Sequence, residues 1–202
     1  MRSEQTSTLS VRVIQSLEEL EYLREFWVTS AGHRDSNMDF YIEFVRSTPE
    51  IIRPHVVVLS RGNQLAAILI GRLERVRLNW KIGYLKLPSL TVDCITFVYG
   101  GLRGDASEEN CRELVASVID SLRDGEADMA FFHHPDLSSH LSRFARELPG
   151  FACRDLLPQA SVHHFMQLPE SMEKVYLGLS SDHRSELRRK AKKLKGAFGD
   201  QV

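Results

Sequence analysis

Apolar and polar positions follow two different periods in the first quarter of the chain. Residues 9–14 (LSVRVI) alternate, which predicts a strand, whereas 17–28 repeat apolar side chains at helical spacing. Ser16 and Glu19 form an S-x-x-E capping box at the start of that helix. A shorter helix is expected over about 38–47, and Pro49 closes it.

The middle of the chain has the composition of β-structure. The runs HVVVLSR (55–61) and QLAAILIGRLE (64–74) flank a turn at Gly62-Asn63 and predict a hairpin. The same patterns predict strands at 79–87, 94–100, 127–135 and 161–169, helices at 107–123 and 137–147, and helical residues from Ser171 with a break near Gly178.

This order, β-α-α-β-β-β-β-α-β-α-β, predicts an α/β (α+β) fold with a mixed, mostly antiparallel sheet. Neither repeats nor a linker-like composition interrupt the chain before about residue 170. We therefore expect one domain over 1–169, followed by a helical segment over 170–202 that ends in a basic helix.

Composition narrows the class of protein. The 202 residues are 43% hydrophobic and 26% charged, as in ordinary globular proteins, and the formal net charge of −1 does not favour nucleic acid. No apolar run approaches 18 residues and the N-terminus lacks an apolar signal region, so neither a membrane span nor a signal peptide is expected. The three cysteines lack C-x-x-C spacing, which favours a reducing, cytoplasmic location without a zinc site.

Charge is concentrated near the end of the chain. Residues 183–195 hold seven Lys or Arg and one Glu, a net +6 that leaves −7 for the rest. Leu187, Ala191, Leu194 and Phe198 form an apolar stripe on the helix that this segment predicts. Three interpretations remain open: a basic helix packed on its own domain, a phosphate grip by Arg184 and Arg188, and, least favoured, a lysine face for nucleic acid.

The element order resembles that of the GNAT acyltransferase superfamily. The stretch YLGLSSDHRSELRRKAKKLKGAFGD (176–200) also resembles the opening of the second domain in its two-domain Fem-like branch, which includes CelD-like acetyltransferases. The resemblance implies acyl transfer, from acetyl-CoA or another acyl-CoA, or from aminoacyl-tRNA, to an amine of a small molecule or cell-envelope precursor. It also implies no permanently bound cofactor, and a chain that holds the N-terminal half and the start of the second GNAT-like domain. Arg184, Arg188 and Arg189 fall in the basic motif and become candidate ligands of a phosphate-bearing substrate.

The stretch GLRGDA (101–106) lies between a predicted strand and a helix, where coenzyme-A-binding GNAT domains carry [Q/R]-x-x-G-x-[G/A]. Glycines there let backbone N–H groups approach a pyrophosphate at the helix N-terminus. Gly104 and Ala106 match, while Gly101 stands where Gln or Arg is expected, so the candidate coenzyme residues are Gly101, Arg103, Gly104 and Ala106. The acidic side chains Asp105, Glu108 and Glu109 oppose phosphate, and an ordinary strand–helix turn is the alternative.

Two histidine pairs, His133-His134 and His163-His164, fall on predicted strands. Adjacent strand residues point to opposite faces, so neither pair chelates one metal ion, and no metal site is expected. His134 is a candidate general base beside the GLRGDA loop, with an ordinary strand histidine as the alternative.

The sequence therefore leaves two functions open. One is an N-acyltransferase of which this chain is the non-catalytic half. The other is a non-catalytic binding module that docks a partner or nucleic acid through its basic helix.

Overall fold

The computed structural model describes residues 9–30, 36–79, 81–82, 84–86, 88–155, 162 and 170–199. The chain divides into two compact units, Met1–Leu156 and Leu157–Val202, and each is described by itself. The domain boundary predicted at residues 169 and 170 falls inside the second unit.

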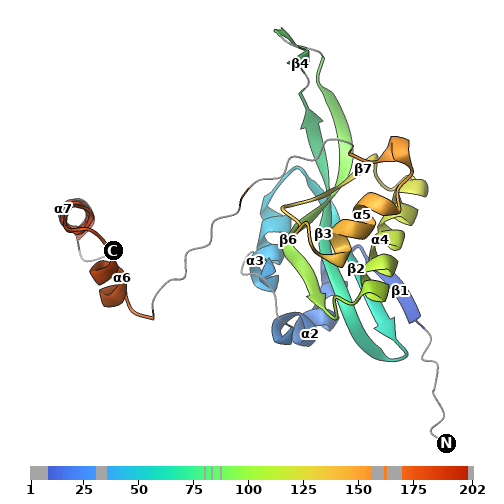
Figure 1. Cartoon of the computed structure of the whole chain (residues 1–202), viewed down its shortest axis with the longest axis horizontal. Coiled ribbons are helices and arrows are strands. Elements are labelled where there is room, and N and C mark those ends of the chain that lie inside the picture. The colour runs from blue at the N-terminus through green and yellow to red at the C-terminus, as the bar shows by residue number, and fades with distance from the viewer. Residues whose placement is uncertain are drawn as a thin grey trace, which may run out of the picture. The chain divides into compact units, whose positions relative to one another are not determined.

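The first unit is built on a five-stranded sheet with the order β1-β2-β3-β6-β7 (Figure 1). Neighbouring strands are antiparallel except β6 and β7, which are parallel, so the predicted mixed, mostly antiparallel sheet is confirmed. The strands are β1 (Leu9–Ile14), β2 (Ile51–Arg61), β3 (Gln64–Leu78), β6 (Leu90–Gly104) and β7 (Met129–Phe132).

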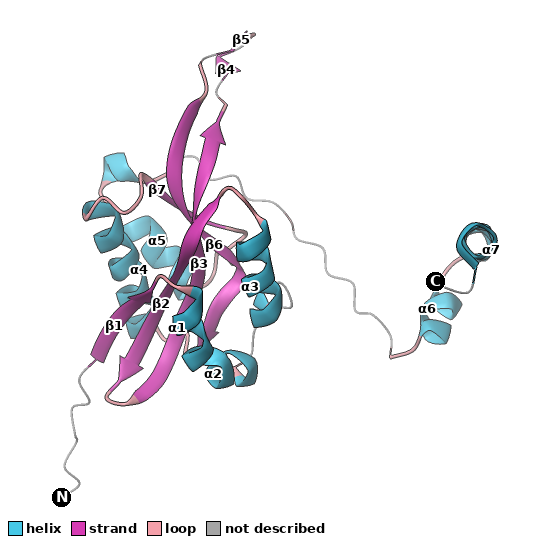
Figure 2. Ribbon diagram, turned by 180° about the vertical axis from the view of Figure 1, so that it is seen from behind, coloured by secondary structure: helices cyan, strands magenta, loops and turns pink. Residues whose placement is uncertain are grey.

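Helices cover both faces of this sheet (Figures 1 and 2). One face carries α1 (Leu17–Leu20), a 3₁₀ turn (Glu21–Leu23), α2 (Arg24–Thr29) and α3 (Met38–Ser47); the other carries α4 (Glu108–Arg123) and α5 (His140–Glu147). Alternate residues of the central strands supply two separate cores, because side chains alternate across a strand. Val57, Leu59 and Leu69 pack towards α4 and α5, and Val56, Val58, Ile68 and Ile70 pack towards α1, α2 and α3.

Several boundaries agree closely with the sequence pattern. The Asn37 side chain accepts a hydrogen bond from the Phe40 N–H and caps α3, which ends at Ser47 before Pro49. The Gly62-Asn63 turn joins β2 to β3, and Gly62 adopts φ +59°, a value that glycine reaches without strain.

One predicted strand is wrong. Residues 79–87 form no single strand; they hold two short ones, β4 (Lys81–Ile82) and β5 (Leu85–Lys86), that pair with each other. The chain therefore reverses direction here. Strand β2 stops pairing with β3 at Glu74, so the ends of β3 and β6 project as a two-stranded arm that carries β4 and β5 (Figure 2).

A wide bulge interrupts β6. Gly71 of β3 pairs with Phe97, but Leu69 pairs with Leu102, so residues 98–101 stand opposite Ile70 alone. The bulge reverses which residues face which core: Phe97 belongs to the core under α4 and α5, and beyond the bulge Leu102 packs against that core instead. Arg103 consequently points to the opposite face, towards α2.

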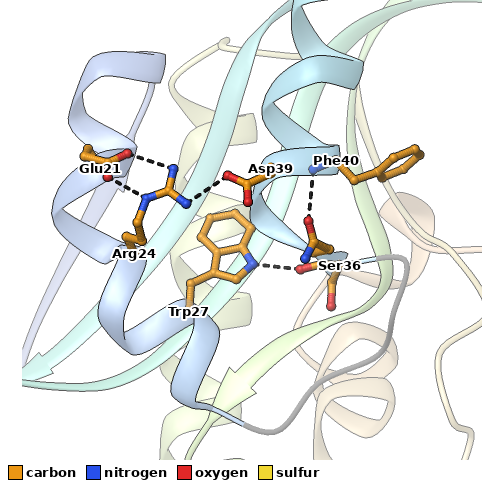
Figure 3. A network of polar contacts seen from close by, with 7 residues as sticks. Glu21, Arg24, Trp27, Ser36, Asp39 and Phe40 are labelled. Carbon is orange, nitrogen blue, oxygen red and sulfur yellow. Dashed lines mark hydrogen bonds and ion pairs between the residues drawn. The ribbon is translucent and has the colours of Figure 1, made fainter.

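A polar network fastens α2 and α3 to each other. The Arg24 guanidinium lies between Glu21 and Asp39, 2.8 Å from the Asp39 carboxylate, and both partners hold the pKa of Arg24 above its usual value (Figure 3). The Trp27 indole N–H donates to the Ser36 carbonyl at 2.7 Å. These bonds hold α2 and α3 together.

The described part of the second unit contains two helices, α6 (Met172–Gly178) and α7 (Ser181–Phe198), and thus confirms the predicted break near Gly178. The Ser180 hydroxyl accepts the His183 N–H and caps α7. The strand predicted over 161–169 lies outside the described residues apart from Val162. Within the described part of the chain, no helix has the length and apolar character needed to cross a bilayer.

Candidate functional site

The candidate site is a pocket where β6 and β7 separate. The two strands pair from Cys94 and Met129 to Phe97 and Phe132, and His133 N–H closes the ladder by donating to the Phe97 carbonyl at 3.2 Å. Directly beyond this rung β6 enters its bulge. The resulting pocket has a volume of ≈ 270 Å³, and its lining is mostly apolar.

Two stacked aromatic rings form the inner wall of this pocket. Phe97 and Phe132 lie 4.7 Å apart between ring centroids with an interplanar angle of 21°. Phe97 is 1% exposed, and Leu69 and Leu141 line the pocket beside it. The wall therefore offers dispersion contacts to an apolar group and no buried charge.

The rim of the pocket is polar. His133 and His134 follow β7, and Asp136 and Ser139 lead into α5. His134 has φ +44°, a left-handed conformation that is uncommon outside glycine and is enriched at functional sites. Its ring lies 6.2 Å from that of Tyr99, which also lines the opening.

The rim carries little positive charge. Burial, and then the nearby charges of Arg72 and His134, lower the pKa of His133, so its imidazole is neutral at pH 7. The Asp136 carboxylate accepts the N–H and the hydroxyl of Ser138, and these hydrogen bonds lower the pKa of Asp136. The mouth thus presents a neutral imidazole and an ionised carboxylate.

The structure corrects the expectation for Arg103. This residue is 7% exposed, and its guanidinium donates to the carbonyls of Trp27, Ser30 and Ser36 at 2.8–2.9 Å. Because the bulge turns Arg103 to the face opposite the pocket, its charge holds the loop after α2 to the sheet. It is a structural residue and is not placed to contact a coenzyme at the pocket.

The three other candidates of the GLRGDA loop have separate places. Gly101 is buried and lines the pocket, and a Cβ on it would come within 2.8 Å of the Ile70 carbonyl oxygen. Gly104 has φ +88°, and a Cβ there would lie 2.4 Å from the Ala66 oxygen, so both glycines are required by packing. Ala106 is exposed before α4.

An acidic side chain, Asp105, lies in the turn just before α4. The Asp105 carboxylate accepts the Ser107 N–H at 3.0 Å and the Asn110 side-chain amide at 2.8 Å, while the Asp105 N–H donates to the Ala66 carbonyl. The backbone N–H groups of Asp105 and Ser107 are therefore already bonded, whereas the first turn of α4 has no side-chain cap from Ser107. Because Glu108 and Glu109 add negative charge in the first turn, the residues of this loop do not fit a pyrophosphate.

The arginines of the basic motif all lie on α7. Arg184 is half-buried, whereas Arg188 and Arg189 are exposed. In the same helix, Lys190 forms an ion pair with Glu186 at 2.9 Å. The helix is continuous through the motif, so all of these cations lie on a single helix of the second unit.

Sequence reasoning did not single out the wall of the pocket. The pattern places Phe97 and Phe132 among core residues and gives Gly71 no special role. The available signal was the pair Gly100-Gly101 within an apolar run, since glycine in a strand interior indicates a bulge or a close backbone approach.

Among the described residues no cluster of His, Cys, Asp or Glu is arranged to hold a metal ion; His163 and His164 lie outside them.

No protein-family model matches the sequence, and no curated protein matches it. Weakly similar solved structures include wild-type TTHA1254 from Thermus thermophilus, with 15% identity over 79% of this chain and 99% of that chain, TM-score 0.42. A transcriptional regulator from Bacillus halodurans has 11% identity over 76% of this chain and 100% of that chain, TM-score 0.41.

Proposed function

We propose that this protein is the non-catalytic, substrate-binding part of an N-acyltransferase, and that another GNAT-like domain supplies the coenzyme site. In this proposal the pocket between β6 and β7 receives the apolar part of a substrate, an amine-bearing small molecule or cell-envelope precursor. The setting is the cytoplasm, where acyl-CoA and aminoacyl-tRNA are available as donors.

The observation that carries the proposal is the Asp105 carboxylate at the start of α4. It accepts hydrogen bonds where a donor's pyrophosphate is expected, and two further acidic side chains follow it. A small apolar pocket is retained nearby, where the strands separate. An apolar pocket without a phosphate cradle favours binding of a substrate over turnover of a coenzyme.

Acetyl-CoA turnover by the purified protein tests the proposal. Coenzyme A release is followed chromatographically over a panel of primary amines, and we expect no rate above that of the protein-free reaction. Calorimetry with acetyl-CoA and with its pyrophosphate-free analogue S-acetyl-N-acetylcysteamine adds a second readout. Weak binding of both compounds is expected, because the donor site belongs to another domain and the pyrophosphate has no partner here; sustained turnover, or tight binding of acetyl-CoA, would contradict the proposal.

The second candidate is a binding module that uses α7, and the exposure of Arg188 and Arg189 favours it. Fluorescence anisotropy with labelled DNA and RNA at increasing salt separates the two functions, since affinity carried by phosphate contacts falls steeply with salt. Tight, salt-sensitive binding that is lost in Arg188→Ala with Lys192→Ala would support the module. We expect weak binding that these substitutions hardly change.

A further inference from the structure

A two-stranded arm extends beyond the part of the sheet that helices cover. It consists of the ends of β3 and β6, residues 75–78 and 90–93, which pair with each other beyond the last pair of β2 with β3. The apolar residues of these two ends, 76, 78, 90 and 92, belong to neither core of the first unit. Among the helices described in this unit, none lies over the arm in either view (Figures 1 and 2). The arm is therefore a surface that the described helices of this unit leave uncovered.

The register of the arm sorts its side chains onto two faces. Residues that are paired across an antiparallel ladder share a face, and successive residues of a strand alternate. The register gives an apolar face, made of the pairs Val76–Val92 and Leu78–Leu90, and a polar face, made of the pairs Arg75–Asp93 and Arg77–Thr91. On the apolar face, Leu90 is 52% exposed. An amphipathic ribbon of this kind indicates an interaction surface, because an isolated two-stranded hairpin is only marginally stable in water.

The charge of the arm is positive. The Arg77 guanidinium donates to the hydroxyl of Ser89 at 2.8 Å, a partner without charge, while Arg75 pairs with Asp93 at 3.4 Å. Both arginines are exposed. The segment 75–92 holds four Lys or Arg and no Asp or Glu, a net +4 that leaves −5 for the rest of the chain. An anionic surface is therefore the complementary partner of the arm.

We propose that this arm docks onto the surface of a bilayer that contains anionic phospholipids. The apolar face lies against the acyl chains, and the arginines reach the phosphates of the headgroups, as in amphipathic elements that bind in the plane of the interface. Tyr84, between β4 and β5, is fully exposed, and tyrosine is enriched where a bilayer meets water. This inference goes beyond the proposed function and does not depend on it, since it concerns neither the pocket nor a substrate.

The apolar face favours a bilayer over nucleic acid. Contacts with a phosphate backbone come from charged and polar groups, which would use only the polar face and leave the apolar side chains in water. A second copy of the arm would bring the same excess of cations, so the two arms would repel each other. A bilayer accommodates both faces at once, because acyl chains take the apolar side chains and each Lys or Arg near anionic headgroups adds a favourable contribution.

Co-sedimentation of the full chain with lipid vesicles tests this proposal. Vesicles of phosphatidylglycerol and phosphatidylcholine in equal amounts are compared with vesicles of phosphatidylcholine alone. We expect at least about tenfold stronger partitioning to the anionic vesicles, since each Lys or Arg near the surface contributes about fivefold. Higher salt should weaken this partitioning without abolishing it, because salt screens the charges and not the apolar contacts. Leu78→Ser with Leu90→Ser should remove the part that resists salt.

Two pairs of arginine substitutions separate the arm from the net charge of the protein. Arg75→Gln with Arg77→Gln should lower partitioning to the anionic vesicles by at least about fivefold. Arg112→Gln with Arg123→Gln makes the same change in net charge on α4, away from the arm, and should leave partitioning almost unchanged. Circular dichroism verifies that each variant is folded.

A fluorophore on the arm separates its binding from that of α7, which is also basic. Tyr84→Cys combined with Cys153→Ser leaves one exposed thiol, because Cys94 and Cys111 are buried. A polarity-sensitive label on this thiol should shift its emission to the blue with the anionic vesicles and keep its emission with phosphatidylcholine vesicles.

Three results overturn the proposal: equal partitioning to both kinds of vesicle, undiminished partitioning of the folded Arg75→Gln, Arg77→Gln variant, or a label that stays in water while the protein binds. The last result would assign the binding to α7. Binding of a DNA duplex that is lost in the same arginine variant, without binding to vesicles, would assign the arm to nucleic acid and also overturn the proposal. Turnover of acetyl-CoA would contradict only the proposed function, so the two failures are distinguishable.

Discussion

Acidification should destabilise this protein through one histidine. His55 of β2 is 0% exposed, and neither ring nitrogen has a hydrogen-bond partner in the described structure. Burial lowers its pKa to about 4, although the Glu126 carboxylate, 3.7 Å away, acts in the opposite direction. The folded protein therefore holds His55 neutral over a range in which the unfolded chain protonates it.

The sign and size of the effect follow from proton linkage. An unperturbed histidine titrates near 6.5, so between pH 6.5 and pH 4 the unfolded state binds more protons than the folded state. The stability contributed by neutral His55 is complete above pH 6.5 and is lost as the pH falls towards 4. At about 1.4 kcal/mol per pH unit, the loss amounts to about 3 kcal/mol.

Urea unfolding at about pH 7 and pH 4 measures this loss. Carboxylates also titrate in that window, so the relevant quantity is the difference in pH dependence between the unchanged protein and His55→Leu. We expect His55→Leu to lose about 3 kcal/mol less on acidification. His140→Gln, a substitution of a histidine outside both cores, is the matched control and should keep the full dependence. The same pH dependence in His55→Leu and the unchanged protein would refute the reasoning.

Three further predictions concern the bulge and the thiols. Arg103→Met should lower the free energy of unfolding by about 3 kcal/mol in denaturant titrations, because it leaves buried carbonyls without a donor; an unchanged midpoint would contradict the structural role. Gly104→Ala should lower the free energy of unfolding by at least about 2 kcal/mol more than Gly62→Ala does. Both glycines have positive φ, but of the two only Gly104 would bring the added Cβ against backbone, at the Ala66 oxygen. Equal melting temperatures of the two variants would contradict this prediction. Ellman's reagent should label one thiol quickly, the exposed Cys153, and should reach the two buried ones only in denaturant; rapid labelling of all three would be inconsistent with this fold.

Hydrophobic periodicity predicted most helices and strands of the first unit because a capping, turn or proline residue marked where those elements begin or end. The helix over 38–47 has an asparagine cap and a following proline, and the hairpin has its Gly-Asn turn. The stretch 79–87 lacked such a signal. Its alternation indicates which face a residue occupies but not the direction of the chain, and Ile82 of β4 pairs with Leu85 of β5 only three residues later.

The position of the candidate site could be predicted from the sequence, but its composition could not. The pattern places the GLRGDA segment between a strand and α4, whereas its first four residues form the end of β6; His134 lies at the rim of the pocket. The prediction for Arg103 fails because four residues, 98–101, stand opposite one on β3. That bulge exchanges the two faces of the strand, and nothing in the spacing of the motif reports it.

Asp105 also determines how the stability of this domain depends on its surroundings. When a ligand phosphate binds the N-terminus of a helix in the folded state only, the folded state becomes more stable as the concentration of that ligand rises. Here the carboxylate is part of the chain and bonds Ser107 and Asn110. The turn before α4 is therefore held by bonds within the chain, and its folding requires no phosphate-bearing ligand to bridge these groups.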